Sequence, residues 1–186
     1  MSSYFFSHFA LHIIGTLGVG LSNFPWLSAS ILFPIGSAFL IPFIPDNGEG
    51  KEVRWFALIV ALITFLVTVG SYINGFDINN ESIQLKESIN WLPKLGLTWS
   101  VGADGISMPL ILLTSFITAL AVLAAWPVKF KPKLFFFLIL IMDGGQIAVF
   151  AVQDMLLFFL SWELELLPVY LPVSYTHLTL PTTPYV

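Results

Sequence analysis

The sequence contains no cysteine and has few charged residues. The missing cysteine excludes disulfides, thiolate zinc sites, iron–sulfur ligation and a cysteine nucleophile within its 186 residues. Charged residues make up 10% of the chain, whereas a soluble domain has about 25%. So few charges could not cover a water-facing surface. With 7 basic against 11 acidic residues, no basic patch points to a nucleic-acid partner.

Apolar residues take the place of the missing charge. They make up 57% of the chain, and aromatics make up 16%, led by 18 phenylalanines. This composition excludes intrinsic disorder. It indicates an all-α polytopic membrane protein, whose length suits roughly five helices of about 20 residues. No phosphate-binding loop, dinucleotide fingerprint, HExxH motif or nucleophile elbow is present.

Apolar runs bounded by charges predict five membrane spans within residues 24–173. They are Phe24–Pro45, Trp55–Gly75, Asp104–Trp126, Leu134–Val152 and Met155–Val173. Residues 1–23 hold a sixth candidate, Ser7–Leu21. Three interpretations are open for it: an extra helix, a signal-like leader or an upstream extension. It lacks the basic region of a secretory signal. Residues 174–186 are rich in Thr and Pro and are interpreted as a tail foreign to the fold.

The loop charges predict an orientation. Asp46–Arg54 and Pro127–Lys133 hold five of the seven basic residues, and Phe76–Ala103 holds the other two. The positive-inside rule places the first two loops in the cytoplasm or its equivalent, and the third on the opposite side. The very short connection at Gln153–Asp154 predicts that the last two spans form a tight helical hairpin.

Glu163 is the strongest candidate for chemistry. It lies eight residues after Met155, which is about 12 Å along a helix and near the middle of a hydrocarbon core of about 30 Å. A carboxylate at that depth is tolerated when it faces a bundle interior or a water cavity, and it indicates proton binding and release. The alternative is a buried glutamic acid that only makes a structural hydrogen bond.

Two neighbours of Glu163 could support or share its role. Glu165 lies about 200° further round the helix, so the two carboxylates cannot face one cavity. It is either a secondary acid or a packing acid at an interface. Pro168 removes a helical hydrogen bond. The carbonyls freed beside the acid could then hold water for a proton path, or the proline could simply bend the helix.

Asp143 and Asp104 are two further acids in or beside spans. Asp143 precedes two glycines that allow close helix approach. It is either a second protonatable site or a polar group paired across the helical hairpin. Asp104 or Ser107 can cap the following helix, and capping is a sufficient explanation. All seven bases are predicted to lie in loops, so no base of this chain pairs with Glu163. His8 and His12 are too weak a signal for a metal site, and none is predicted.

Four segments together resemble one known family. They are Trp99–Pro109, Ala124–Pro127, Gly144–Asp154 and Trp162–Tyr170. They are similar to chain 4 (the D chain) of the cyanobacterial and chloroplast NAD(P)H–plastoquinone oxidoreductase complex, the counterpart of the M subunit of bacterial complex I. The resemblance runs from about residue 24 to residue 171. It implies that the chain is the N-terminal part of a longer antiporter-like subunit built from two inverted helical repeats.

The resemblance also implies roles for single residues. Glu163 matches the family's central glutamate, which pairs with lysines on later helices to move protons. Glu165 matches only the plant-type motif, so no catalytic role is carried over to it. Asp143 departs from the family, which usually has a bulky aromatic residue there. The family's orientation, with its first helix beginning on the lumenal side, agrees with the loop charges.

The function implied is proton translocation coupled to electron transport in a thylakoid membrane. NAD(P)H or another electron donor, iron–sulfur clusters and plastoquinone would then be bound by other subunits of the complex, and no cofactor by this chain. Its partners would be those membrane subunits and the lipid bilayer. The fragment alone is expected to be inactive. Two alternatives are a stand-alone Na⁺/H⁺ antiporter of the related family and an inactive partial gene product.

Overall fold

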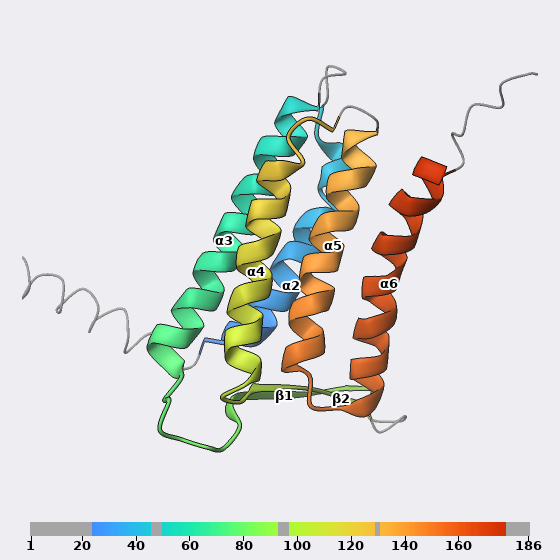
Figure 1. The fold of residues 1–186 in the computed structure, drawn as a ribbon. Helices are drawn as coiled ribbons and strands as arrows, with labels where there is room; N and C mark the ends of the chain where they lie inside the picture. Colours follow the sequence, from blue (N-terminus) through green and yellow to red (C-terminus); the bar gives the residue numbers. More distant parts are fainter. Residues whose placement is uncertain (1–23, 46–49, 93–96, 129–130, 178–186) are drawn as a thin grey trace, which may run out of the picture.

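The computed structural model describes residues 24–45, 50–92, 97–128 and 131–177. The candidate span Ser7–Leu21 and residues 178–186 of the predicted tail lie outside this part. The elements in chain order are α2 (Trp26–Ala38), the 3₁₀ turn η1 (Ile41–Phe43), α3 (Lys51–Gly75), β1 (Gln84–Leu92), β2 (Leu97–Ala103), α4 (Ser107–Ala124), α5 (Pro132–Ala151) and α6 (Met155–His177) (Figure 1).

The helices confirm an all-α polytopic membrane protein. Four of them are long and apolar enough to cross a membrane: α2 together with η1, α3, α4 and α5. The fifth expected span corresponds to α6, a helix of 23 residues. It continues beyond the expected end at Val173 to His177. The side chains of Leu167 and of residues 169–177 lie outside the described part.

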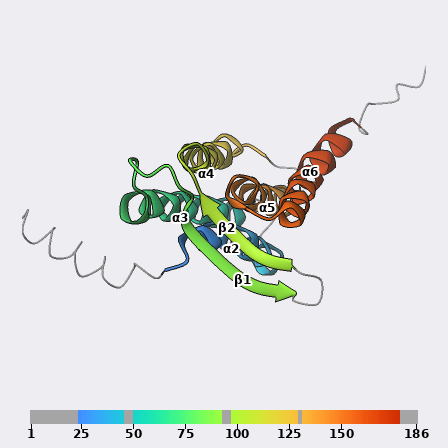
Figure 2. The same cartoon turned by 90° about the horizontal axis from the view of Figure 1, so that it is seen from below.

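The helices α2, α3, α4 and α5 form an antiparallel bundle, and α6 lies outside it against α5 (Figures 1 and 2). One buried cluster, which includes Ala57 and Phe136, lies towards one end of the bundle. A second, which includes Leu27, Ile111 and Ile147, lies towards the other end. Since lipid is as apolar as these side chains, close packing rather than burial from water holds such helices together.

The predicted basic loops meet at one end of the bundle, called here the basic end. Arg54 Nη2 donates to the Val128 carbonyl at 2.8 Å, and Lys133 Nζ donates to the Ile44 carbonyl at 2.8 Å. Both carbonyls follow helix ends, where backbone acceptors lack helical partners. The expectation that all bases lie in loops is wrong, because α3 begins at Lys51 and α5 at Pro132. Arg54 and Lys133 bind carbonyls at the bundle edge, and the helices that carry them begin four and two residues before the predicted spans.

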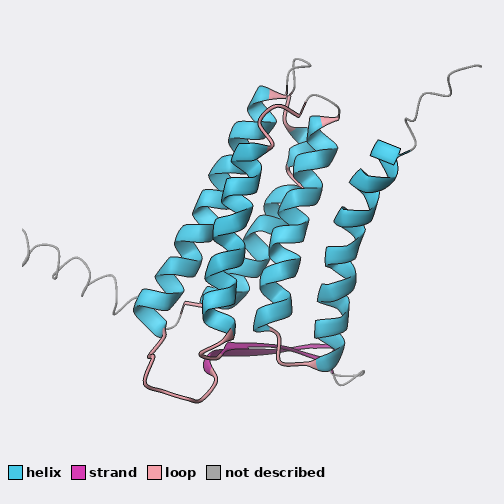
Figure 3. Ribbon diagram, in the orientation of Figure 1, coloured by secondary structure: helices cyan, strands magenta, loops and turns pink. Residues whose placement is uncertain are grey.

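A two-stranded antiparallel β-hairpin lies across the other end of the bundle (Figures 2 and 3). It forms within Phe76–Ala103, where the sequence predicted only a loop. Glu87 on β1 accepts hydrogen bonds from the backbone amides of Leu27 and Ser28, both at 2.9 Å. The indole Nε1 of Trp99 on β2 donates to Ser28 Oγ at 2.7 Å. The β-hairpin therefore caps the start of α2, where amide groups are free and the helix dipole favours a carboxylate.

A β-bulge in β1 directs Glu87 towards α2. Gln84 pairs with Ala103 and Glu87 with Val101, so β1 contains one extra residue between these pairs. Leu85 adopts a left-handed backbone conformation there, with φ of 52°. Its side chain packs against Gly75 so closely that a β-carbon on Gly75 would clash. Bulges of this kind re-aim the side chains that follow them.

Strand β2 also holds the turn between α5 and α6. The backbone amide of Gln153 donates to the Ser100 carbonyl at 2.9 Å, and Val101 forms an isolated antiparallel bridge with Val152. The predicted tight helical hairpin is confirmed, since α5 and α6 are separated by this short turn and pack against each other. The β-hairpin thus contacts both the first described helix and the turn that leads into the last.

Candidate functional site

Glu163 lies on the exposed face of α6. Its neighbours Trp162 and Leu166 are 51% and 48% exposed, and Glu163 itself is exposed. Among the helices that the structure describes, Glu163 therefore does not face the bundle interior, and its predicted role in proton binding and release stays a prediction. The reason is that α6 packs on the bundle through α5, and Glu163 lies off that contact face.

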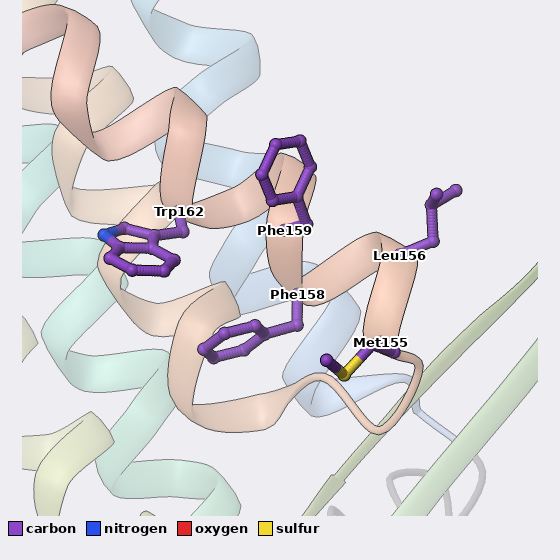
Figure 4. A pocket seen from close by; sticks show the side chains of 5 residues that line it. All are labelled: Met155, Leu156, Phe158, Phe159 and Trp162. Atoms are coloured by element: carbon purple, nitrogen blue, oxygen red, sulfur yellow. The ribbon is translucent and has the colours of Figure 1, made fainter.

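An apolar groove lies on α6 beside Glu163, towards the β-hairpin end. Figure 4 shows its lining side chains, which all come from the first two turns of the helix: Met155, Leu156, Phe158, Phe159 and Trp162. Phe159 is 53% exposed and Met155 is 86% exposed. Glu163 therefore follows directly after a surface made of large apolar and aromatic side chains.

Glu165 faces α5 instead. Its Oε1 accepts a hydrogen bond from Gln146 Nε2 at 3.1 Å. A β-carbon built on Gly145 would lie 3.6 Å from the Ser161 carbonyl oxygen and the Glu165 amide nitrogen. These are ordinary van der Waals distances, so α5 and α6 pack here no more closely than an alanine would allow. Of the acids in these two helices, Glu165 is the one with a partner across the helical hairpin.

Asp143 is buried inside the bundle, with 1% of its surface exposed. Among the described residues, neither of its carboxylate oxygens has a hydrogen-bond partner. The Thr118 side chain of α4 interacts with it without the geometry of a hydrogen bond. The interpretation that Asp143 is paired across the helical hairpin is therefore wrong, because Gln146 takes that place and Asp143 points to α4.

Gly144, beside Asp143, brings α5 close to α2. A β-carbon at this position would lie 2.7 Å from the Ile31 carbonyl oxygen and would also clash with the Ile35 side chain. The two glycines after Asp143 therefore serve different contacts: Gly144 serves the contact with α2, and Gly145 the contact with α6. The predicted close helix approach is confirmed at Gly144 alone, because a β-carbon at Gly145 would meet its neighbours at ordinary distances.

Buried hydroxyl groups near Asp143 were not identified from the sequence. Thr68 Oγ1 of α3 lies 2.8 Å from Ser115 Oγ of α4. Ser71 Oγ donates to the Thr68 carbonyl at 2.7 Å. A signal was present, because Thr68 and Ser71, like Ser115 and Thr118, are three apart in apolar helices and so share a helix face.

Asp104 caps α4. Its Oδ1 accepts hydrogen bonds from the Ser107 amide at 2.7 Å, the Ser107 hydroxyl at 2.8 Å and the Ile106 amide at 3.0 Å. Its own amide donates to Ser107 Oγ at 2.8 Å, which makes a reciprocal capping arrangement. The bonds from Ser107, followed by the one from Ile106, hold the pKa of Asp104 below its ordinary value of 3.8. The capping explanation is confirmed.

Pro168 lies buried within α6, which is assigned as one continuous helix from Met155 to His177. Its proposed support of a water path stays a prediction. In the described part of the chain, no group of three or more His, Cys, Asp or Glu side chains could hold a metal ion. His8 and His12 lie outside that part.

Comparison with known proteins identifies the relatives. No protein-family model matches the chain. NAD(P)H-quinone oxidoreductase chain 4 of Prochlorococcus marinus subsp. pastoris is 91% identical over 171 residues, which is 92% of this chain and 31% of that protein. The resemblance to the chain 4 family is confirmed. The chain 4 protein of Prochlorococcus marinus strain MIT 9313 is 79% identical over 149 residues, which is 80% of this chain and 26% of that protein.

The matches with chain 4 set a limit on this chain. It spans less than a third of the length of these chain 4 relatives. A role that needs side chains from the rest of a chain 4 protein therefore cannot be assigned to the described helices alone. The last two described helices carry the buried acid Asp143 on α5, and the exposed acid Glu163 and the paired acid Glu165 on α6.

Proposed function

We propose that this chain is the N-terminal transmembrane part of a membrane-arm subunit in a proton-translocating NAD(P)H–plastoquinone oxidoreductase of the thylakoid membrane. The observation that carries the proposal is the 91% identity with a protein named NAD(P)H-quinone oxidoreductase chain 4. The helices long and apolar enough to cross a membrane support it. The relatives compared above bear the chain 4 name and not that of a stand-alone antiporter.

Glu163 is the carboxylate we assign to proton uptake and release. It lies about 12 Å along α6 from the β-hairpin end, close to mid-membrane depth. A carboxylate in contact with lipid is costly. We infer that further protein covers this face of α6 in the assembled subunit. Pro168, one turn beyond Glu163, would leave a backbone carbonyl without its helical donor, available to hold water.

In this proposal, other subunits of the complex carry out electron transfer. NAD(P)H or another donor, the iron–sulfur clusters and plastoquinone are bound there, and this chain supplies part of the membrane path for protons. Its partners are the neighbouring membrane subunits and the lipid bilayer. The path is completed by basic side chains from outside the described bundle, since the described bases lie at the basic end or in the β-hairpin.

Glu163→Gln in the full-length subunit of the assembled complex tests the assignment. Gln keeps the size and hydrogen-bonding of the side chain but cannot carry a proton as a carboxyl group does. We expect loss of proton pumping, measured with a pH-sensitive dye in sealed membranes during quinone reduction. Glu165→Gln is the matched control, because its amide oxygen can still accept the bond from Gln146, and it should pump normally.

Two outcomes would contradict the proposal. Unchanged pumping in Glu163→Gln would remove this carboxylate from the proton path. Na⁺-driven proton transport by the isolated full-length subunit in liposomes would favour the stand-alone antiporter. Assembly of each variant is checked by native gel electrophoresis, so that a failure to assemble is distinguished from a failure to pump.

A further inference from the structure

A line of buried hydroxyl groups crosses from α3 to α4 and ends beside a buried carboxylate on α5. Its members are Ser71, Thr68, Ser115, Thr118 and Asp143, and none is more than 6% exposed. Thr68 Oγ1 and Ser115 Oγ lie 2.8 Å apart and join the two helices. Thr118 follows Ser115 on the same face of α4 and lies beside Asp143, although no hydrogen bond joins the two side chains. Polar groups thus continue from one helix to the next inside an apolar bundle.

This line starts near the β-hairpin end and reaches mid-depth. Ser71 lies about 6 Å along α3 from its end at Gly75, and Asp143 lies about 12 Å along α5 from its end at Ala151. Both of those helix ends are at the β-hairpin. The line therefore points from the β-hairpin side of the membrane to the buried carboxylate.

The hydrogen bond between the Thr68 and Ser115 hydroxyls can run in either direction. Thr68 Oγ1 is also 2.8 Å from the Phe65 carbonyl oxygen, and Ser115 Oγ is 3.1 Å from the Leu112 carbonyl oxygen. Each hydroxyl has one hydrogen to donate. When Thr68 donates to Ser115, Ser115 donates to Leu112. When Ser115 donates to Thr68, Thr68 donates to Phe65. Both patterns make the same number of bonds with the heavy atoms in place, so the hydrogen bond between the two hydroxyls can reverse its direction, as a hydroxyl in a proton route must.

No charged group near Asp143 compensates for an ionised carboxylate. Helices α2 and α4 contain no titratable residue. The charged residues of α3 (Lys51, Glu52 and Arg54) lie in its first turn at the basic end, and Tyr72 lies near the β-hairpin end. On α6, Glu165 bonds to Gln146, and Glu163 is exposed. A buried carboxylate without a counter-charge or hydrogen bond is costly, so a bound proton is the simplest way to neutralise it.

We propose that Asp143 is a proton-binding site, separate from Glu163, which exchanges its proton with the β-hairpin side through the hydroxyls of Thr118, Ser115 and Thr68. One proton adds to a carboxylate oxygen of Asp143 and neutralises it. Release returns the same proton along the same hydroxyls. The inference rests on α3, α4 and α5 alone and does not need Glu163 to pump.

Infrared spectroscopy of the full-length protein in lipid tests this site directly. A protonated Asp143 should give a carboxylic C=O band at neutral pH that is missing in Asp143→Asn and shifts to lower frequency after transfer to D₂O. Removing both relay hydroxyls, with Thr68→Val and Ser115→Ala together, should slow that shift by roughly tenfold or more. Thr64→Val is the matched control, because Thr64 is buried one turn away and its hydroxyl donates to the Val60 carbonyl. It should leave the rate unchanged.

Three other outcomes would overturn the proposal. A wild-type spectrum without a band that Asp143→Asn removes would mean that Asp143 holds no proton. A band that does not respond to D₂O would mean a sealed, purely structural acid. Equal rates in the double variant and the wild type would exclude the hydroxyl route. Should the double variant fail to fold, Ser115→Ala alone serves, with Ser115→Thr restoring the hydroxyl and the rate. Failure of the Glu163 assignment would leave these spectra unchanged.

Discussion

The Glu87 carboxylate on β1 accepts a hydrogen bond at 2.9 Å from the amide of Leu27, 60 residues earlier in the chain. Its second oxygen accepts from Ser28 at the same distance. A side chain from the β-hairpin thus performs the capping that a residue just before α2 would usually provide. Pro25, which precedes α2, makes no side-chain cap.

Replacing Glu87 should weaken the attachment of the β-hairpin. Glu87→Ala removes both acceptors and is expected to lower the free energy of unfolding by about 1–2 kcal/mol, in the range of other lost caps. Chemical unfolding in detergent measures this, and trypsin cleavage at Lys86 reports release of the β-hairpin. Glu81→Ala, at an exposed position of the preceding loop, is the control. Equal stability of the two variants would show that the cap contributes nothing.

Gly144 and Gly145 should respond differently to the same change. Gly144→Ala places a methyl group 2.7 Å from the backbone oxygen of Ile31, which can yield only if α2 and α5 separate. We expect a loss of about 1–3 kcal/mol, as for other overpacked sites. In Gly145→Ala the methyl group meets atoms at 3.6 Å, an ordinary contact, and stability should hardly change. A similar loss in both variants, measured by thermal unfolding, would contradict this α2–α5 packing.

The Asp104 cap should make stability depend on pH. The pKa of Asp104 is lower in the folded protein than its ordinary value of 3.8. The ionised form therefore stabilises the fold above that value, and the effect is lost as the pH falls through the folded pKa. Asp104→Ala should cost about 1 kcal/mol at neutral pH and less in acid. Asp104→Asn keeps an acceptor without a charge, so its capping should not vary with pH in unfolding titrations.

The two ends of the bundle should face opposite compartments. Single cysteines can be introduced at Ile78, which is 75% exposed near the β-hairpin, and at Lys131 at the basic end. In a cysteine-free full-length background, a membrane-impermeant maleimide should label Ile78→Cys from the lumenal side and Lys131→Cys from the cytoplasmic side. Labelling of both positions from one side of sealed vesicles would refute the orientation.

The hydropathy pattern alone predicted the membrane spans well. A span must make its backbone hydrogen bonds within its own helix, because lipid offers no partners, and so it is visible in the sequence as one long apolar run. The capping role of Asp104 was predictable because every group involved lies within four residues of the chain. Local interactions of this kind leave a direct sequence signal.

The β-hairpin and the surroundings of the acids could not be predicted in this way. The bonds of Glu87 join segments 60 residues apart, and nothing near Glu87 in the sequence marks its partners. The exposure of Glu163 depends on which helices cover α6, which a periodic pattern does not reveal. Asp143 and Glu165 differ in environment because α5 turns Asp143 towards α4, whereas α6 turns Glu165 towards Gln146 of α5.

The β-hairpin holds the turn from which the two membrane acids are equally distant along the chain. Gln153, in the turn it holds, lies between the end of α5 and the start of α6. Asp143 is eight residues before Ala151, and Glu163 is eight residues after Met155. Any vertical displacement of that turn would carry both carboxylates through the bilayer by the same amount. A conformational signal arriving at the β-hairpin would therefore act on the two acids in synchrony, although one is buried and the other faces outwards.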